Sequence, residues 1–193
     1  MKKYQKWHLP LEQDSTLVGD ALKELQEHGS DSIDGDIPLI IRMMENPQFG
    51  WLNDDLFPGA ACLVTHDVIH VLLGRGMMPK DEAFVIGYTM GSTKRMTNWR
   101  TKLFCWINQS FYPSYYRFSD EEARVFEWGV ACGRNCETDL SRLFVDDIID
   151  KPVRLVRKAL GIDIEMLQWQ YQIEAEMYPH SHESARSAGM VHV

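Results

Sequence analysis

The chain has 193 residues, of which 45% are hydrophobic and 11% aromatic, and its formal charge is −8 at pH 7. This length and apolar fraction exclude a wholly disordered chain and favour one globular domain with a sizeable core. The runs of apolar residues are far shorter than the roughly 20 residues of a membrane span. The net acidity argues against a nucleic-acid binder, because such proteins carry a basic surface.

The N-terminal stretch MKKYQKWHLPLEQD has no apolar core segment and soon turns acidic, which is unlike a signal or transit peptide. Nothing in the sequence indicates secretion, so we expect a cytoplasmic setting with reduced thiols. The four cysteines are Cys62, Cys105, Cys132 and Cys136.

Prolines, glycines and capping residues divide the chain into segments with apolar stripes. Ser15 is expected to cap the first helix, and Pro58 is expected to start the helix that carries residues 59–73. A capping box of Ser119 and Glu122 predicts a later helix start. Pro79 is expected to open one helix, and Asp163 is expected to cap the last one. In chain order, the expected helices lie within residues 15–29, 38–46, 58–74, 79–92, 97–110, 119–132, 150–161 and 163–177.

No segment alternates as a β-strand does, and there is no internal repeat or long linker. The predicted fold class is therefore all-α: a single compact helical domain of about seven to eight helices over residues 1–178. Residues 179–193 show no apolar period, and they are expected to form a disordered C-terminal tail.

One motif carries metal chemistry: the segment THDVIHVLLG with His66, Asp67 and His70. Residues four apart share a helical face, so both imidazoles can reach one point, and Asp67 can lean toward it. The chain then reverses at a glycine, and Glu82 in the next helix would return over His70. Two histidines with one or two carboxylates make an open metal site. The plainer alternative is a pair of surface histidines or of N–H donors to carbonyls.

The pattern His66-Asp67-x-x-His70, followed by eleven residues and Glu82, resembles the motif of a ubiquinone biosynthesis family. This is the coenzyme Q biosynthesis protein family that is fourth in the pathway's conventional numbering. The context HDVIHVLLG is similar to its HD-x-x-H-x-L-L-G, and residues 153–162 are similar to its C-terminal helix ending in Leu-Gly-Ile. The segment MPKD at 78–81 lacks that family's glycine before the glutamate.

The resemblance implies an all-helical protein that binds a divalent metal, usually zinc, with iron, magnesium or manganese as alternatives. It implies prenylated quinone precursors or other isoprenoid lipids as ligands, and the other biosynthetic enzymes as partners. The protein would act as an oxidative decarboxylase at ring carbon C1, as a scaffold, or as both. His66, Asp67, His70 and Glu82 would be its metal ligands and catalytic residues. A site with open positions suits Lewis-acid activation of a phenolic ring, or oxygen chemistry with iron.

Residues 94–118 combine five basic residues with eight aromatic ones and contain no acidic residue. This composition favours a membrane–water interface, so we expect peripheral contact with the inner face of a membrane, or a groove for a prenyl tail. The alternative is a core helix whose stripe is Leu103, Trp106 and Ile107. RNA binding by the same patch is less favoured.

Gly87 and Gly91 lie four apart in the helix that carries Glu82. Because glycine weakens a helix, the pair indicates either close packing with another helix, which we favour, or room for a prenyl chain. Cys132 and Cys136 are expected to be buried thiols rather than metal ligands.

Two other functional classes compete with the quinone hypothesis. In an HD-type phosphohydrolase, His66 and Asp67 would bind metal together with His28 upstream and Asp139 or Asp146 downstream. A non-catalytic helical protein that binds lipid or partners would need no metal chemistry at all. A homodimer is a fair expectation for either class.

Overall fold

The computed structural model describes residues 7–29, 56–112, 114 and 117–190. Within these residues the chain forms eight α-helices and two short 3-10 helices and has no strand, which confirms the all-α prediction. None of the described helices is long and apolar enough to cross a membrane. The predicted helix at 38–46 lies outside the described residues.

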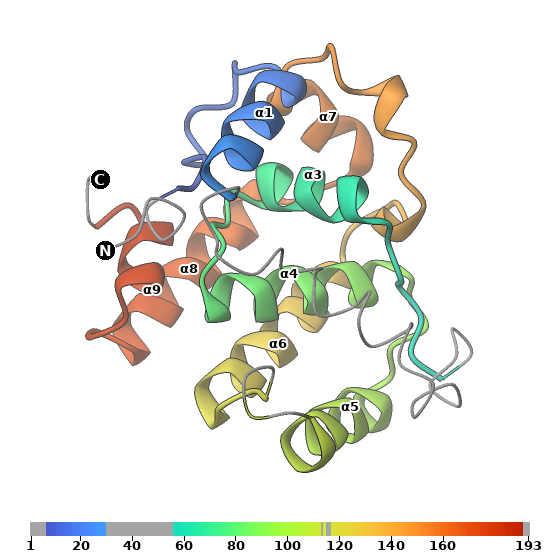
Figure 1. Cartoon of the computed structure of the whole chain (residues 1–193), viewed down its shortest axis with the longest axis vertical. Coiled ribbons are helices and arrows are strands. Elements are labelled where there is room, and N and C mark those ends of the chain that lie inside the picture. Colours follow the sequence, from blue (N-terminus) through green and yellow to red (C-terminus); the bar gives the residue numbers. More distant parts are fainter. Residues whose placement is uncertain (1–6, 30–55, 113, 115–116, 191–193) are drawn as a thin grey trace.

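The helices form one body in which α3, α4, α6 and α8 lie between two ends (Figure 1). Helices α1 and α7 make one end, and α5 makes the other. In chain order the elements are α1 Val18–Gly29, α3 Leu63–Leu73, α4 Pro79–Ser92, α5 Asn98–Phe111, α6 Asp120–Gly133, η4 Leu140–Arg142, η5 Val145–Asp147, α7 Val153–Leu160, α8 Ile164–Met177 and α9 His182–Ser187.

Helices α4 and α6 pack backbone against backbone at the centre of the core. A Cβ atom on Gly87 or Gly91 would overlap a carbonyl of α6, and a Cβ on Gly129 or Gly133 would overlap a carbonyl of α4. Close packing therefore explains the predicted glycine pair. The alternative of room for a prenyl chain is wrong, because the α6 backbone fills that space.

Helix α1 begins at Val18, three residues after the predicted cap at Ser15. Leu17 instead forms an isolated antiparallel bridge with Pro152, and the Val18 N–H donates to the carbonyl of Lys151 at 3.0 Å. These bonds hold the chain extended up to the helix. Val18, Ala21, Leu22 and Leu25 form the buried stripe of α1.

Helix α3 begins at Leu63, and the predicted start at Pro58 is wrong. Gly59 has a φ of 113°, and a Cβ there would lie 2.8 Å from the Cα of Met90 in α4. Cys62 is still extended, with a ψ of 161°. The chain passes close to α4 in a conformation that only glycine adopts easily, and the helix forms after it.

Two predicted helix starts are confirmed in detail. The hydroxyl of Ser119 accepts from the Glu122 N–H at 3.3 Å, and the Glu122 carboxylate accepts from the Ser119 N–H at 2.7 Å. The Asp163 carboxylate accepts from the Met166 N–H at 2.9 Å and caps α8, which ends at Met177 as expected. Cys132 and Cys136 are buried free thiols, as expected.

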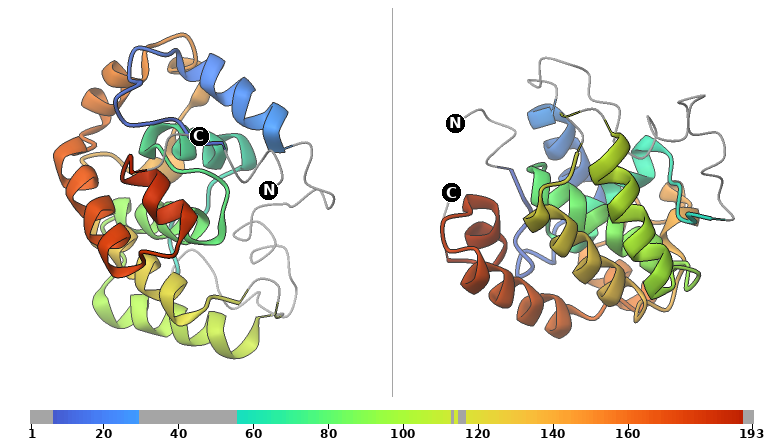
Figure 2. Two further views of the ribbon diagram at one scale, coloured as in Figure 1. Left: turned by 90° about the vertical axis from the view of Figure 1, so that its left-hand side faces the viewer. Right: turned by 90° about the horizontal axis from the view of Figure 1, so that it is seen from below.

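The predicted disorder of residues 179–193 is wrong for the described residues 179–190. Helix α9 packs beside α8 (Figure 2), and Ser184 and Arg186 on it have no exposed surface. The prediction failed because α9 is anchored by polar contacts with buried charges, which leave no apolar period in the sequence. Residues 191–193 lie outside the described part of the chain.

Helix α5 presents large aromatic side chains to the outside. Trp99, Trp106 and Phe111 are 55%, 56% and 58% exposed, and the rings of Trp106 and Phe111 lie edge to face at 5.4 Å. The alternative of a core stripe through Leu103, Trp106 and Ile107 therefore fails at Trp106, whereas Ile107 is buried. The buried side of α5 instead consists of Thr101, Phe104, Cys105, Ile107 and Asn108.

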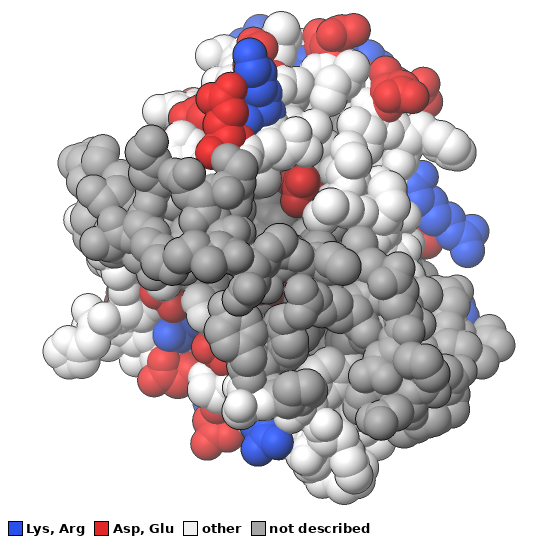
Figure 3. All heavy atoms as spheres, in the orientation of Figure 1, with Lys and Arg blue, Asp and Glu red and all other residues white. Residues whose placement is uncertain are grey.

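Charged side chains of both signs lie next to one another at the end of the molecule formed by α1 (Figure 3). The exposed pair of Lys23 and Glu27 on α1, 4.0 Å apart, is an example. Exposed pairs of this kind contribute little to stability.

Candidate metal centre

Three of the four predicted ligands meet at one point between α3 and α4. His66 and His70 lie one turn apart on α3, and Glu82 lies in the first turn of α4. One ligand atom from each side chain lies within 4.8 Å of the other two. The predicted return of Glu82 over His70 is thus what the structure shows.

The turn between the two helices produces this meeting. Gly74 ends α3 in the left-handed region, with a φ of 66°, and a Cβ there would lie only 2.8 Å from the Leu9 carbonyl oxygen. Pro79 is the first residue of α4, and the Asp81 carboxylate accepts from the Met78 N–H at 3.0 Å. This cap starts α4 one turn before Glu82 faces His70.

The spacing of the donor atoms fits a single ion. His66 Nε2 lies 3.1 Å from Glu82 Oε2 and 3.0 Å from His70 Nε2, and His70 Nε2 lies 3.3 Å from Glu82 Oε1. Ligands that lie about 2.0–2.2 Å from a zinc ion are roughly 3.0–3.5 Å from one another. Two nitrogens and one carboxylate at these separations suit zinc and iron better than magnesium, which prefers oxygen ligands.

A backbone carbonyl fixes the orientation of His70. Its Nδ1 lies 2.7 Å from the carbonyl oxygen of Gly76. A carbonyl only accepts, so Nδ1 carries the hydrogen, and the Nε2 of the neutral ring keeps its lone pair toward the cluster. Metal-binding histidines usually have this arrangement, in which the other ring nitrogen donates to a carbonyl or carboxylate.

Burial and charge act against each other at the cluster. Burial alone would raise the pKa of Glu82, but the charge on His70 and hydrogen bonds with both histidines outweigh it and hold that pKa well below its usual range. Burial opposes the charged form of His70, yet the carboxylates of Glu82, Asp67 and Asp81 together outweigh burial and raise the pKa of His70. Glu82 is therefore a carboxylate at neutral pH, as a metal ligand must be.

Solvent reaches the cluster along Glu82. The side chains of His66 and His70 are 3% and 2% exposed, whereas that of Glu82 is 31% exposed. The two imidazoles thus form the closed side of the site, and the carboxylate forms its open side. A site of three protein ligands with an open side can accept water or substrate.

The structure does not place Asp67 in this group. Its carboxylate accepts from Gln26 Nε2 on α1 at 3.4 Å, and burial raises its pKa. Adjacent residues of an α-helix are rotated by about 100°, so Asp67 cannot share the face of His66 and His70. The predicted fourth ligand therefore lies beside the cluster rather than in it.

The residues expected of a phosphohydrolase do not assemble either. His28 Nδ1 donates to the Glu24 carbonyl at 2.8 Å within α1, and Asp139 caps η4 by accepting from Ser141. Asp146 lies in η5. In the part of the chain that the structure describes, His66, His70 and Glu82 form the single group of three or more potential ligands, and it includes none of these residues.

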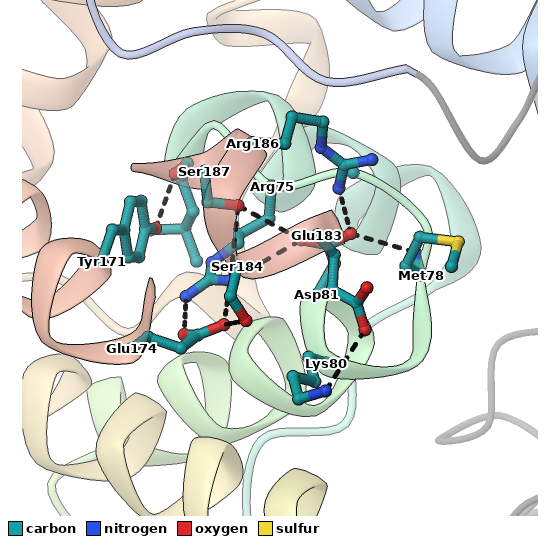
Figure 4. A network of polar contacts seen from close by, with 12 residues as sticks. Arg75, Met78, Lys80, Asp81, Tyr171, Glu174, Glu183, Ser184, Arg186 and Ser187 are labelled. Atoms are coloured by element: carbon teal, nitrogen blue, oxygen red, sulfur yellow. Dashed lines mark hydrogen bonds and ion pairs between the residues drawn. The ribbon is translucent and has the colours of Figure 1, made fainter. Parts of the chain in front are cut away.

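A second buried assembly lies next to the metal centre, and the sequence interpretation missed it. Arg75, Asp81, Glu174 and Arg186 have no exposed surface (Figure 4). The spacing of Leu167, Tyr171 and Glu174 on α8 could have indicated a buried carboxylate, because it places Glu174 on the apolar stripe. Residues 179–193 have no apolar period, so nothing in the sequence indicated that Arg186 is buried.

Arg75 links this assembly across three helices. Its Nη1 donates to Glu174 Oε1 at 3.0 Å and lies 3.6 Å from Asp81 Oδ1. The guanidinium carbon lies 4.3 Å from the ring centroid of Phe84 and 4.0 Å from that of Tyr171. A buried guanidinium suits such stacking, because it is planar and is only weakly hydrated in water.

Comparison of the chain with models of protein families, with curated proteins and with solved structures finds no match. The functional assignment therefore depends on the donor atoms, their geometry and their burial.

Proposed function

We propose that the protein binds one divalent metal ion, zinc by preference, through His66, His70 and Glu82. We further propose that this centre binds the ring of a prenylated quinone precursor, as the resemblance to the ubiquinone biosynthesis family implies. The observation that carries the proposal is the convergence of three donor atoms, with His70 held in the tautomer that leaves Nε2 free.

The charge of the ligand set favours an anionic oxygen as the further ligand. Two neutral imidazoles and one carboxylate leave a formal charge of +1 on a centre with a divalent ion. A bound metal would supply Lewis-acid polarisation of a phenolate or carboxylate oxygen. The buried histidines shield one side of the centre, so the ring has to approach on the side of Glu82.

One centre serves both versions of the hypothesis. A decarboxylase acting at ring carbon C1 and a scaffold that presents intermediates to other biosynthetic enzymes would bind the same ring oxygen. They differ in turnover: incubation of the metal-loaded protein with a prenylated hydroxybenzoate and dioxygen as the oxidant releases carbon dioxide only in the first case. Iron is the alternative ion for the oxidative version.

We also propose that α5 is the contact with the membrane. Its exposed side carries Trp99, Trp106, Phe111 and Lys102, and the helix contains no acidic residue. Aromatic rings and basic groups together favour an anionic membrane surface. The position of α5 at one end of the molecule would leave the opposite end, with α1 and α7, facing the aqueous phase (Figure 1).

Elemental analysis of the purified full-length chain tests the metal assignment. We expect close to one zinc or iron per chain, lost in His66→Ala and in Glu82→Gln. Asp67→Asn is the matched control and should retain the metal, because this carboxylate lies outside the cluster. A metal content that His66→Ala leaves unchanged would refute the proposal. Lipid extraction and mass spectrometry of the same sample test for a bound isoprenoid.

A further inference from the structure

Arg186 of α9 lies against the turn between α3 and α4 and against the first turn of α4. Its guanidinium pairs with Asp81, the residue before Glu82. The same guanidinium and the Trp7 carbonyl fill the space that a Cβ on Gly76 would occupy. The Gly76 carbonyl, in turn, accepts the hydrogen bond from His70. One buried side chain therefore lies against the supports of two ligands.

Asp81 connects Arg186 to Glu82 through the start of α4. The Asp81 carboxylate accepts from the Met78 N–H at 3.0 Å and so fixes the first turn of α4, in which Glu82 lies. A carboxylate with no exposed surface needs a compensating charge. Arg186 supplies that charge on one side, and Arg75 lies on the other.

Helix α9 is held in place by hydroxyl groups as well as by Arg186. Ser184 Oγ donates to Glu174 Oε1 at 2.9 Å, and Ser187 Oγ donates to Asp81 Oδ1 at 3.5 Å (Figure 4). The fully buried charges are two arginines and two carboxylates, so the assembly is neutral as a whole. These contacts fix the position of α9 against the turn between α3 and α4.

We propose that Arg186 is a positioning residue of the metal centre, and that docking of α9 sets the metal affinity of the site. The proposal rests on the proposed metal-binding function. Through Gly76 the docked helix holds His70 in the Nδ1–H tautomer, and through Asp81 it holds Glu82 in register. When α9 is undocked, both ligands lose their supports and the ion is bound more weakly.

Titration of Zn²⁺ into the metal-free, full-length chain tests this proposal. Arg186→Gln should weaken zinc binding by about 10- to 100-fold, the usual effect of removing a partner of a metal ligand. The zinc affinity of Arg186→Lys should lie between those of the wild type and Arg186→Gln, because lysine keeps the charge but not the planar contact with Gly76. Ser92→Ala is the matched control: it removes a buried hydroxyl at the C-terminal end of α4, where Ser92 accepts from the Leu140 N–H at 2.9 Å, and it should leave the affinity unchanged.

A double variant guards against simple unfolding. Asp81→Asn with Arg186→Gln keeps the buried assembly neutral and keeps an acceptor for the Met78 N–H. We expect this variant to fold, as circular dichroism will show, and still to bind zinc more weakly than the wild type. Wild-type affinity in a folded Arg186→Gln or double variant would overturn the proposal.

The tautomer of His70 gives a readout that does not depend on metal. Long-range ¹H–¹⁵N NMR spectra of the metal-free chain, recorded at a pH above the raised pKa of His70, should show the Nδ1–H form in the wild type and in Ser92→Ala, and a mixture in Arg186→Gln. An unchanged tautomer in Arg186→Gln would contradict the positioning role. If the wild type bound no zinc, the proposed function would fail, and the tautomer comparison would still decide the role of Arg186.

Discussion

The Nδ1 of His70 donates a hydrogen bond of 2.7 Å to the carbonyl of Gly76, six residues further along the chain. This bond joins the last turn of α3 to the loop that leads into α4. It makes the short connection between the two helices part of the metal centre, because the loop determines which ring nitrogen of His70 faces Glu82.

Gly76→Ala should damage the site without touching a ligand. The added methyl group would overlap the guanidinium of Arg186 and the Trp7 carbonyl, so the loop has to move. We expect zinc affinity to fall by about 10- to 100-fold and the free energy of unfolding to fall by about 1–3 kcal/mol. Calorimetric titration and denaturant unfolding measure the two effects. Gly161→Ala at the end of α7 is the control, since its methyl group would crowd Glu137 and strain a φ of 70°, so it should lower stability and leave zinc affinity unaltered.

Glu82 and Asp67 should differ sharply as metal ligands. Glu82→Gln removes the charged donor of the cluster, and we expect more than about 100-fold weaker zinc binding, by analogy with the smaller losses seen for indirect partners. Asp67→Asn should change the affinity only slightly, because this carboxylate faces Gln26. Competition with a chromogenic chelator gives both constants. Equal losses in the two variants would contradict the three-ligand site.

His8 should make stability depend on pH in a predictable direction. Burial and the charge of Arg186 lower the pKa of His8 to about 4 in the folded chain, against about 6.5 when unfolded. Between these values only the unfolded state binds the proton, so the contribution of His8 is complete above about pH 6.5 and is lost as the pH falls toward 4. Because His8 is partly exposed, we expect a loss of about 1–2 kcal/mol.

The variant His8→Gln isolates this effect. Urea unfolding of the wild type and of His8→Gln at pH 7 and at pH 4.5 gives four free energies, and carboxylate contributions cancel in the comparison. The wild type should lose more stability on acidification than the variant does. A variant with the same acid sensitivity as the wild type would show that His8 is not the group responsible.

Gly91→Ala should be among the more destabilising substitutions of the core. A Cβ at this position would overlap the carbonyl of Val130, which belongs to the α6 backbone and cannot rotate away. We expect a loss of about 1–3 kcal/mol through forced separation of α4 and α6, although alanine is the better helix former. Thermal unfolding measures the change, and a stabilised Gly91→Ala variant would refute close packing at this contact.

The exposed aromatic residues of α5 should decide membrane binding. The double variant Trp99→Ser with Trp106→Ser should bind vesicles containing anionic lipid more weakly in a flotation assay, with the fold unchanged, because both side chains are more than half exposed. Trp169 on α8 is 63% exposed and provides the matched control. If Trp169→Ser weakened binding as much as the α5 variant, α5 would not be the specific contact.

Local chemistry was sufficient for much of the fold and for the centre of the site. The capping box of Ser119 and Glu122, the Asp163 cap and Pro79 are short-range features, and each predicted its helix start correctly. The spacing of His66 and His70 is likewise a property of one helix turn. The approach of Glu82 could be inferred because only a short turn separates it from His70.

Contacts between distant segments were decided by tertiary structure alone. Helix α1 begins later than predicted because Leu17 forms a bridge with Pro152, and α3 begins later because Gly59 passes close to Met90. No local pattern could indicate either contact. Asp67 is one residue from His66, yet the rotation of the helix turns it to Gln26 and away from the other ligands.

By itself, then, the sequence determined an all-α domain and predicted the meeting of two histidines and a glutamate, because helix periodicity and short turns act over a few residues. Only the tertiary structure showed that α9 belongs to the fold. No apolar pattern around Arg186 indicates that it is buried, since its burial depends on Asp81, a partner 105 positions away in the chain. A buried charge is stable only beside its counter-charge, and that pairing exists only once the chain has folded.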